Sequence, residues 1–369
     1  MNQPLWDDHP WAALPALESA TTCDLCVIGL GGSGLAAILE ALGLGADVIG
    51  IDAVAVGAGA AGRNGGFVLA GLKDFYHDVV AEFGHSQAAR MYAATLEEIQ
   101  HLRQLSPESI RHTGSLRIAT TPKELEDCAL QLKALQADGF PVEEYQGSEG
   151  MGLLFPADCA MNPLARVRGL ARLAVQKGAR LFEATRAVSI DSGLVSGERF
   201  SIKAKKIIVA IDGKLECIFP ELKPKVRTAR LQMLGTAPTE MRLTRPVYAR
   251  YGYEYWQQLP DGRMVLGGFR DHFEAAEWTF EDTPSQALQN QLEQFLRQDL
   301  DIDAPITHRW AASVSYSSQL LPVLEQVHPD VWALGGYSGT GNVIGSIFGR
   351  MSAQVALTGH SELAKTMML

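Results

Sequence analysis

The first part of the chain alternates between short apolar runs and glycine-rich stretches. Residues 26–28 form an apolar run that starts after Asp24 and ends at a glycine, which is typical of a buried strand. The next apolar stretch, 35–45, predicts a helix, and residues 47–52 predict a second strand that ends on a carboxylate. This order predicts a βαβ unit of about 30 residues.

The rest of the chain predicts further helices and strands. The capping box Thr121-Pro-Lys-Glu124, with proline at the first helical position, predicts a helix that ends near residue 138. The run KKIIVAIDG is typical of a strand that returns to a parallel sheet. Between 245 and 268, polar and apolar residues alternate about the turn Pro260-Asp261-Gly262, which predicts an antiparallel hairpin. The other predicted helices are 85–105, 163–177, 285–300 and 343–357, and other predicted strands lie at 114–120, within 180–190 and at 331–334.

This pattern predicts an α/β fold: a Rossmann-type domain with an inserted, mainly antiparallel β domain of α+β type. The first domain is expected to be discontinuous, with segments 1–75, 158–215 and 318–369. The inserted substrate domain is expected to take 76–157 and 216–317.

Composition narrows the classes of function. The chain has 369 residues, of which 47% are hydrophobic and 20% charged, as in an ordinary globular protein. A net charge of −10 makes non-specific nucleic-acid binding unfavourable. The most apolar stretch, 26–51, contains two acidic residues and many glycines, so no integral membrane segment is expected. Five cysteines and an N-terminus without a signal-peptide pattern predict a cytoplasmic protein.

Three glycine tracts carry the candidate chemistry. In the first, Gly29 permits a tight turn, Gly31 lets backbone approach a pyrophosphate, and Gly34 lets the helix pack on the strand. The helix N-terminus attracts anions, and Asp52, which follows Gly34 by 18 residues, can accept the hydroxyls of an adenosine ribose. The fingerprint therefore predicts a dinucleotide site but does not distinguish FAD from NAD.

The second and third tracts, 57–66 and 335–342, favour FAD. A flavin dinucleotide binds in an extended form, so several chain segments must approach it closely. The last tract opens a helix, whose dipole can stabilise negative charge on a reduced flavin. The predicted cofactor-binding residues are Gly29, Gly31, Gly32, Ser33, Gly34, Asp52, Ala53, Gly62, Arg63, Asn64, Gly65, Gly66, Val188, Gly213, Gly339, Thr340, Gly341 and Asn342.

These motifs resemble the glycine oxidase / D-amino-acid oxidase superfamily of FAD-dependent oxidoreductases, and within it the gamma-glutamylputrescine oxidase-like branch. The matching pieces include CDLCVIGLGGSGLAAI, IDAVAVGAGAAGRNGGF and ALGGYSGTGNVIGSIFGRMSA. The resemblance implies a two-domain protein that oxidises a C–N bond by hydride transfer from an amine or amino acid to FAD. The imine would hydrolyse to an aldehyde or keto acid, and oxygen or an electron carrier would take the electrons.

The chain departs from the family pattern at informative positions. An arginine that clamps the substrate carboxylate in the amino-acid oxidases falls on Val314 here, which favours an amine over an amino acid. The usual aspartate before a later turn is Gln319, and the flavoprotein A-T-G motif is Ala210-Ile211-Asp212-Gly213. No cysteine lies between Trp310 and Gly341, so FAD is expected to be non-covalent.

Candidate substrate-facing or catalytic residues are aromatic. Tyr251, Tyr253 and Tyr255 share one face of the predicted hairpin strand if it is regular, and Trp256 takes the other. Tyr255 and Tyr253 are predicted to contact substrate, together with Tyr337 at the start of the third tract. No metal is predicted, since the histidines lack ligand spacing and Cys23-x-x-Cys26 lies within the first strand.

The sequence also allows functions other than amine oxidation. A D-amino-acid or glycine oxidase-like enzyme could hold a carboxylate with Arg270 or Arg250. A flavin-binding protein without turnover, and a 2-hydroxy-acid oxidoreductase with a base such as histidine, are further alternatives. The amine or amino acid, the electron acceptor and the oligomeric state are not predicted.

Overall fold

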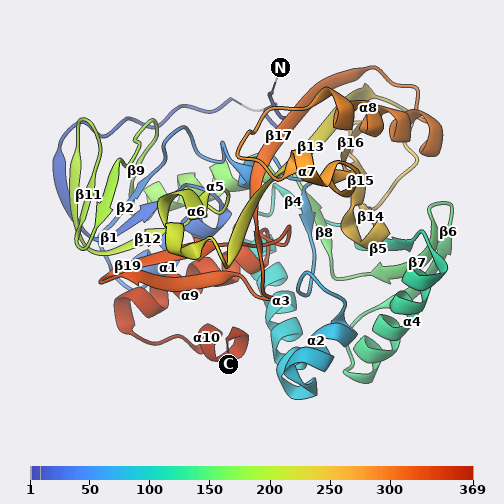
Figure 1. Cartoon of the computed structure of the whole chain (residues 1–369), viewed down its shortest axis with the longest axis horizontal. Helices are drawn as coiled ribbons and strands as arrows, with labels where there is room; N and C mark the ends of the chain where they lie inside the picture. Colours follow the sequence, from blue (N-terminus) through green and yellow to red (C-terminus); the bar gives the residue numbers. More distant parts are fainter. Residues whose placement is uncertain (1, 9, 369) are drawn as a thin grey trace. The chain divides into compact units, whose positions relative to one another are not determined.

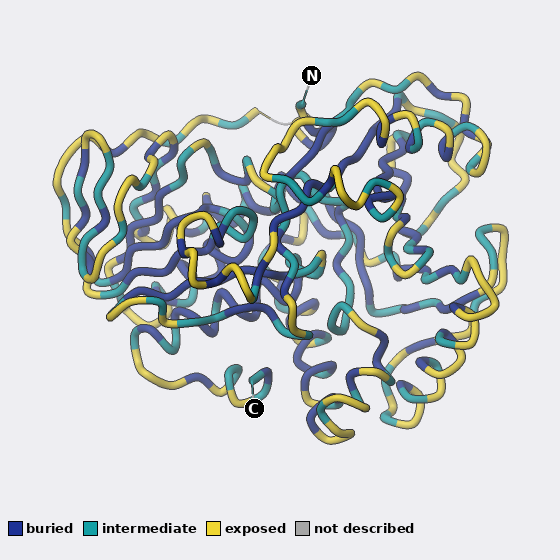
Figure 2. The backbone as a smooth tube through the Cα atoms, viewed as in Figure 1, coloured by how far each residue is buried: buried dark blue, intermediate teal, exposed yellow. Residues whose placement is uncertain are grey.

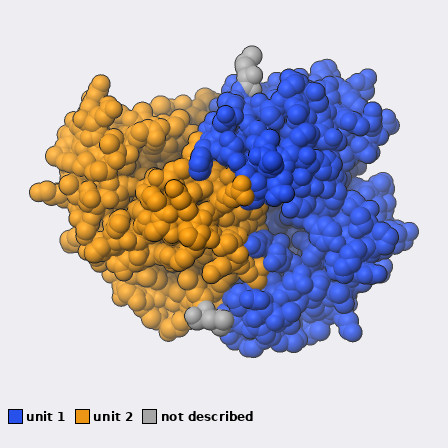
Figure 3. All heavy atoms as spheres, viewed as in Figure 1, with its two compact units in different colours: residues 1–8, 63–163, 229–313 blue, residues 9–62, 164–228, 314–369 orange. Residues whose placement is uncertain are grey.

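The chain forms two compact units, each assembled from three segments (Figure 3). The computed structural model describes residues 2–8 and 10–368. Unit 1 comprises Met1–Asp8, Arg63–Pro163 and Ala229–Ser313, and unit 2 comprises His9–Gly62, Leu164–Thr228 and Val314–Leu369. The chain passes from one unit to the other after residues 8, 62, 163, 228 and 313. The domain boundaries predicted from the sequence were after residues 75, 157, 215 and 317. Which unit binds cofactor and which binds substrate stays a prediction.

Unit 2 is built on a mixed eight-stranded sheet in the order β10-β11-β12-β1-β2-β9, with β19 pairing β12 and β18. β1 runs parallel to β12 and β2, and β2 runs parallel to β9, so the predicted βαβ unit and the return of KKIIVAIDG are confirmed. The strands are β1 Ala20–Ile28, β2 Val48–Ile51, β9 Arg180–Phe182, β10 Ser189–Asp191, β11 Leu194–Ser196, β12 Ser201–Val209, β18 Val323–His328 and β19 Val331–Gly335.

Two helices of unit 2 lie side by side against this sheet (Figure 1): α1 (Gly32–Gly43) and α9 (Ile344–Thr358). Their crossing is close, because a Cβ on Gly349 would lie 2.2 Å from the Ser33 carbonyl oxygen. The central strands are buried on both faces (Figure 2), as covered parallel strands must be. The other helices are α5 Pro163–Gln176, α6 Leu215–Ile218, η2 Pro220–Leu222, α10 Glu362–Met367 and the 3-10 turn η1 Ala60–Gly62.

Unit 1 contains the predicted antiparallel structure. Its main sheet has the order β17-β13-β16-β15-β14-β5-β7-β6, and β3-β8-β4 form a small sheet. From β13 to β6 the neighbouring strands pair antiparallel, except β14 and β5, which pair parallel. The predicted hairpin is confirmed as β15 and β16, whose turn contains Gly262 at φ +89°. The strands are β3 Phe67–Val68, β4 Ile110–His112, β5 Ser115–Ala119, β6 Glu143–Gly147, β7 Gly150–Phe155, β8 Cys159–Met161, β13 Val226–Pro238, β14 Val247–Ala249, β15 Glu254–Gln258, β16 Arg263–Gly268 and β17 Ile306–Ser317, of which β13 and β17 each have one end in unit 2.

The helices of unit 1 follow their local sequence signals. The Thr121 hydroxyl caps α4 by accepting from the Glu124 amide at 3.2 Å, as predicted. The Glu124 carboxylate accepts from the Thr120 amide at 2.9 Å rather than from the cap residue itself. The helices are α2 Tyr76–Phe83, α3 His85–Leu105, α4 Pro122–Ala137, α7 Glu274–Glu277 and α8 Gln286–Gln294, with 3-10 turns η3 Arg250–Gly252 and η4 Arg270–Phe273 and a π-helical turn η5 Phe295–Asp299.

The predicted common face for the three tyrosines is wrong. Tyr251 has φ +54° within η3, and Tyr253 follows that turn, so β15 begins only at Glu254. Tyr255 and Trp256 do lie on opposite faces: the Trp256 ring packs on Phe295, whereas the Tyr255 ring packs on Phe67.

Two kinds of feature are absent from residues 2–8 and 10–368. No helix there is long and apolar enough to cross a membrane. No group of three or more His, Cys, Asp or Glu side chains in these ranges is arranged to hold a metal ion. All five cysteines are free, and burial raises the pKa of Cys23 to about 12.

Candidate functional site

The first glycine tract joins β1 to α1 in unit 2, and two of its glycines are required by packing. Gly29 has φ +106°, and a Cβ there would lie 2.6 Å from the Ala210 carbonyl oxygen on the neighbouring segment. A Cβ on Gly34 would lie 1.9 Å from the Gly29 carbonyl oxygen. These contacts allow the helix to start immediately beside the strand.

Gly31 has a different role. It is the N-cap of α1 with φ −90° and ψ −171°, an extended conformation open to any residue. A Cβ there would meet within 4 Å only the Ala61 Cβ, at 3.3 Å. The fold itself therefore tolerates a side chain, and glycine leaves space above the N-terminus of a 12-residue helix with no acidic residue in its first turn. This cradle fits the pyrophosphate of a dinucleotide.

Asp52 follows β2 and has a fixed orientation. Its Oδ2 accepts from the Leu30 amide at 3.0 Å and its Oδ1 accepts from the Val54 amide at 2.9 Å. Burial raises the pKa of this carboxyl, against the effect of these hydrogen bonds. Each carboxylate oxygen has a second lone pair, so the group can also accept ribose hydroxyls. Ala53 continues the chain beside it.

The second tract packs on α5. Gly57 has φ +71°, and a Cβ there would lie 2.5 Å from Val167. A Cβ on Gly62 would lie 2.3 Å from the Gly57 carbonyl oxygen. Helix α5 also brings Arg166, only 1% exposed, toward the first tract, with Nη1 3.2 Å from the position of a Cβ on Gly32. This buried cation beside the helix N-terminus was not predicted, and no local sequence signal marks it.

The third tract precedes α9 and is held by Asp212. The Asp212 Oδ1 accepts from the amides of Gly336 at 2.9 Å and Tyr337 at 3.3 Å, and its Oδ2 accepts from the Ser315 amide at 3.2 Å. Burial raises the pKa of Asp212 to about 6. This residue occupies the altered A-T-G motif, where its φ of +53° suits aspartate better than a β-branched residue.

The remaining residues of this tract form the entry to α9. Gly339 has φ +91°, and the Thr340 hydroxyl donates to the Tyr337 carbonyl oxygen at 2.7 Å. The Tyr337 ring packs over Gly341, whose Cβ would lie 3.3 Å from it. Burial raises the pKa of the Tyr337 hydroxyl, which is 6% exposed as a residue, so this phenol stays protonated. Its contact with substrate stays a prediction, as do cofactor contacts of Gly341 and Asn342.

Residues 63–66 belong to unit 1 and lie beside β15. The Arg63 guanidinium donates from Nε to the Ala311 carbonyl oxygen at 2.9 Å and from Nη2 to Asn2 at 2.6 Å. A Cβ on Gly65 would lie 3.1 Å from the Tyr255 ring, and Gly66 has φ +75°. The loop is therefore close to Tyr255, although direct cofactor contacts of Arg63, Asn64, Gly65 and Gly66 stay predictions.

The two arginines considered for a substrate carboxylate differ. Arg250 pairs with Asp271 at 2.6 and 2.8 Å and with Glu254 at 2.6 Å, so its charge is already matched by carboxylates. Arg270 is 8% exposed and stacks on Trp278, with its guanidinium carbon 4.7 Å from a ring centroid. Tyr253, which is 37% exposed, lies 5.9 Å from the same guanidinium.

Two predicted cofactor residues lie in unit 2 away from the first tract along the chain. Val188 is 68% exposed and precedes β10, and its amide donates to the Ser196 carbonyl oxygen at 2.7 Å. Gly213 directly follows Asp212. Their contacts with FAD stay predictions.

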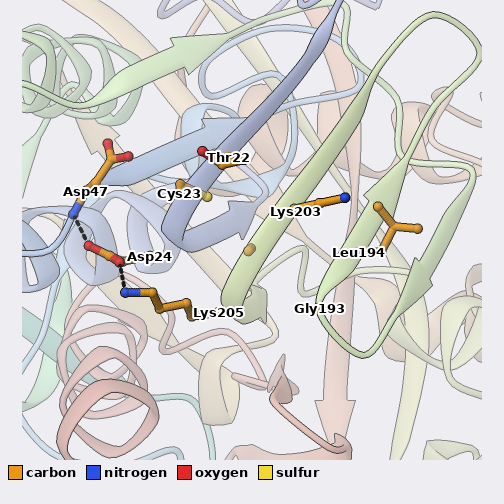
Figure 4. A pocket seen from close by; sticks show the side chains of 9 residues that line it. Thr22, Cys23, Asp24, Asp47, Gly193, Leu194, Lys203 and Lys205 are labelled. Atoms are coloured by element: carbon orange, nitrogen blue, oxygen red, sulfur yellow. Dashed lines mark hydrogen bonds and ion pairs between the residues drawn. The ribbon is translucent and has the colours of Figure 1, made fainter.

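A surface hollow of about 490 Å³ lies at the amino end of β1 (Figure 4). Ligands of doubly wound sheets bind at the opposite, carboxyl ends of the strands. Both acidic residues here are already paired, Asp24 with Lys205 at 2.7 Å and Asp47 with Arg180 at 2.6 Å. The hollow therefore adds nothing to the candidate site. Its lining residues are Thr22, Cys23, Asp24, Asp47, Gly193, Leu194, Lys203, Ala204 and Lys205.

Comparison with known proteins agrees with the glycine geometry. Residues 24–355 match the family model described as "FAD dependent oxidoreductase". The chain is 26% identical to the probable oxidoreductase OrdL of Rhizobium meliloti (strain 1021), over 95% of this chain and 86% of that protein. It is 24% identical to the gamma-glutamylputrescine oxidoreductase of Escherichia coli (strain K12), over 96% of this chain and 88% of that protein.

A solved structure shows the same fold. Glycine oxidase from Geobacillus kaustophilus superposes with a TM-score of 0.75 at 17% identity, over 94% of this chain and 98% of that chain. The predicted fold class and the resemblance to this superfamily are confirmed.

Proposed function

Because the chain belongs to the family of FAD-dependent oxidoreductases, we propose that it binds FAD non-covalently and oxidises the C–N bond of an amine. The product is an imine, which hydrolyses to an aldehyde and an amine or ammonia. When bound, FAD supplies the acceptor for the hydride that leaves the carbon beside the substrate nitrogen. Oxygen or an electron carrier then accepts the electrons.

The cofactor part of the proposal is supported by the first glycine tract. A Cβ on Gly31, at the α1 N-terminus, would meet only the Ala61 Cβ, Asp52 is oriented at the end of β2, and buried Arg166 brings positive charge toward the same turn. These groups suit a pyrophosphate and an adenosine ribose. Non-covalent attachment is favoured by the absence of cysteine between Trp310 and Gly341.

The choice of an amine over an amino acid depends on the arginines. Position 314, where the amino-acid oxidases of the resemblance carry their carboxylate clamp, is valine. Arg250 is matched by Asp271 and Glu254, and a guanidinium already paired twice is a poor ligand for a substrate carboxylate. The named activity of the Escherichia coli relative, on gamma-glutamylputrescine, points in the same direction.

Aromatic side chains are proposed to receive the amine. Tyr255 is half-buried on β15 beside Gly65, and its ring can attract a cation before the proton leaves. Apolar surroundings favour the neutral amine that hydride transfer requires, because desolvation lowers the pKa of an ammonium group. Tyr253 and Tyr337 are proposed as further substrate contacts.

One observation favours a second candidate, an amino-acid oxidase of the glycine or D-amino-acid type. Arg270 is buried, and its guanidinium carbon lies 4.7 Å from the Trp278 ring and 5.9 Å from the Tyr253 ring, low-dielectric surroundings in which a guanidinium can bind a carboxylate strongly. Under this alternative, Arg270→Gln raises KM for the amino acid. Under the amine proposal it leaves KM for a diamine derivative within about twofold.

Anaerobic titration of the purified holoprotein separates the candidates. We expect gamma-glutamylputrescine or another putrescine derivative to bleach the oxidised flavin spectrum, and glycine and D-alanine to leave it unchanged. Bleaching by the amino acids alone would reject the amine proposal in favour of the second candidate. A protein that holds FAD but is bleached by no amine or amino acid would point to flavin binding without this turnover. A cytoplasmic location and an unknown oligomeric state accompany the proposal as predictions.

A further inference from the structure

The carbonyl groups of residues 63–66 are held by an unusual set of donors within unit 1. The indole Nε1 of Trp310 donates to the Arg63 carbonyl oxygen at 2.7 Å, and the indole Nε1 of Trp6 donates to the Asn64 carbonyl oxygen at 2.8 Å. The Gly65 carbonyl oxygen accepts from the Gln257 side chain at 2.5 Å. The Gly66 carbonyl oxygen accepts from the Met161 amide at 2.8 Å. Four successive carbonyls are therefore fixed by donors from four separate segments.

The donors are themselves rigid. Trp6 is 1% exposed, Trp310 0% and Gln257 1%, so each is fully packed. The loop also holds itself, since the Gly66 amide donates to Asn64 Oδ1 at 2.9 Å. A buried indole usually donates to a protein acceptor, and here both indoles donate to the same short loop.

Residues 2–8, which we call the N-terminal strap, contribute one of these indoles and are tied to the loop a second time. Arg63 Nη2 donates to the backbone and side-chain oxygens of Asn2, each at 2.6 Å. Asn2 Oδ1 also accepts from the Ala311 amide at 2.9 Å, next to Trp310 on β17. Leu5 packs closely on β13, since a Cβ on Gly235 of that strand would lie 2.4 Å from the Leu5 side chain.

We propose that Trp6 and Trp310 are positioning residues that preset the 63–66 backbone for FAD, so that the N-terminal strap is part of the cofactor-binding machinery. In a trans peptide the C=O and the following N–H point in opposite directions. Holding the carbonyls of Arg63 and Asn64 against the indoles turns the amides of Asn64 and Gly65 toward the opposite side. A loop with amides already oriented suits an electronegative edge of a ligand, and it binds without first losing backbone entropy. This inference rests on the proposed binding of FAD.

Trp6→Phe and Trp310→Phe each remove one N–H donor and keep most of the buried ring. We expect each to weaken FAD binding to the deflavinated protein by roughly five- to twentyfold, the usual consequence of one lost buried hydrogen bond. Binding of ADP, which needs only the first glycine tract, should not change. Hydrogen exchange at residues 63–66 should become faster without FAD.

Trp256→Phe is the matched control. Trp256 is 6% exposed in the same unit, and its Nε1 has no hydrogen-bond partner among the residues that the structure describes. Its substitution removes an indole of similar burial without removing a hydrogen bond, so FAD affinity and exchange at 63–66 should stay at the wild-type values.

Each outcome decides the question. The proposal is supported if both variants bind FAD more weakly and ADP as well as wild type does, while the control Trp256→Phe keeps wild-type FAD affinity. Parallel loss of FAD and ADP binding, or values equal to those of Trp256→Phe, overturns it. If one variant does not fold, the other and Gln257→Met, which removes the donor to Gly65, are measured in the same way. If wild-type protein binds no FAD, the proposed function itself fails. That result is distinct from one in which only the positioning role of Trp6 and Trp310 fails.

Discussion

Replacing Gly31 by alanine should separate folding from cofactor binding. Gly31 has an extended backbone that alanine adopts without strain, and the added Cβ meets only the Ala61 Cβ, at 3.3 Å. That contact needs a shift of a few tenths of an ångström, so the free energy of unfolding of the cofactor-free protein should change by less than about 1 kcal/mol.

The same methyl group should obstruct FAD. It projects at the N-terminus of α1, where the pyrophosphate is proposed to approach the backbone, and it extends about 1.5 Å from the Cα. A displacement of that size breaks a charge-assisted N–H···O bond, which is worth about 1.5–3 kcal/mol. The Kd for FAD should therefore rise roughly tenfold to 150-fold.

The assay is urea unfolding of the deflavinated protein together with fluorescence titration by FAD. Gly43→Ala is a matched control, because no atom lies within 4 Å of its added Cβ, and it should leave the Kd unchanged and raise stability by up to about 1 kcal/mol. Gly34→Ala, with a Cβ 1.9 Å from a carbonyl oxygen, should be strongly destabilised. Wild-type FAD affinity in Gly31→Ala, or a loss of stability as large as that of Gly34→Ala, would contradict the proposed role of Gly31.

Three further predictions concern stability. Burial raises the pKa of Asp212 from 3.8 to about 6, so the folded state binds this proton more tightly; that stability is fully present below about pH 4 and is lost as pH rises through 6. In urea unfolding, the free energy of unfolding of the wild-type protein should therefore fall by up to about 3 kcal/mol as pH rises through this range, and Asp212→Asn should not show that fall. The same pH dependence in Asp212→Asn as in wild type would contradict the raised pKa of Asp212. Glu277→Gln should cost about 3–5 kcal/mol because it leaves buried Arg230 underpaired, whereas Glu281→Gln, exposed and 3.4 Å from the same guanidinium, should cost less than about 1 kcal/mol; equal losses would refute this. Thr121→Ala should destabilise by about 1 kcal/mol in thermal unfolding through loss of the α4 cap, and no shift in the midpoint would show that the cap is dispensable.

The parts of the site that sequence alone predicted are local in the chain. Gly29, Gly34 and Asp52 belong to one βαβ unit whose spacing the sequence shows, and the clash that requires Gly34 is with the nearby Gly29 carbonyl oxygen. The clash that requires Gly29 is with Ala210, a distant segment, so the motif predicted this glycine without revealing its contact. The helix at 122–137 likewise carries its own start signal, the Thr121 cap followed by Pro122. Sequence patterns predict a feature well when the residues that determine it lie close together in the chain.

Other features depend on contacts between distant segments. Arg166 reaches the first tract from α5, and Trp6 meets a carbonyl 58 residues away, so neither role is visible in a motif. The alternating pattern around Tyr251 predicted a strand, but a left-handed turn at Arg250 and Tyr251 ends β14 and delays β15 to Glu254. Arg250 in this turn pairs with Asp271 and Glu254, and the pair with Asp271 joins residues that a local alternating pattern does not connect.

FAD binding is tested first by the visible absorption spectrum of the purified protein, recorded before and after denaturation and removal of the precipitate. We expect a yellow protein with the two absorption bands of an oxidised flavin, about one FAD per chain, and complete release of FAD into the supernatant. A colourless protein that takes up no added FAD would contradict the proposed FAD binding.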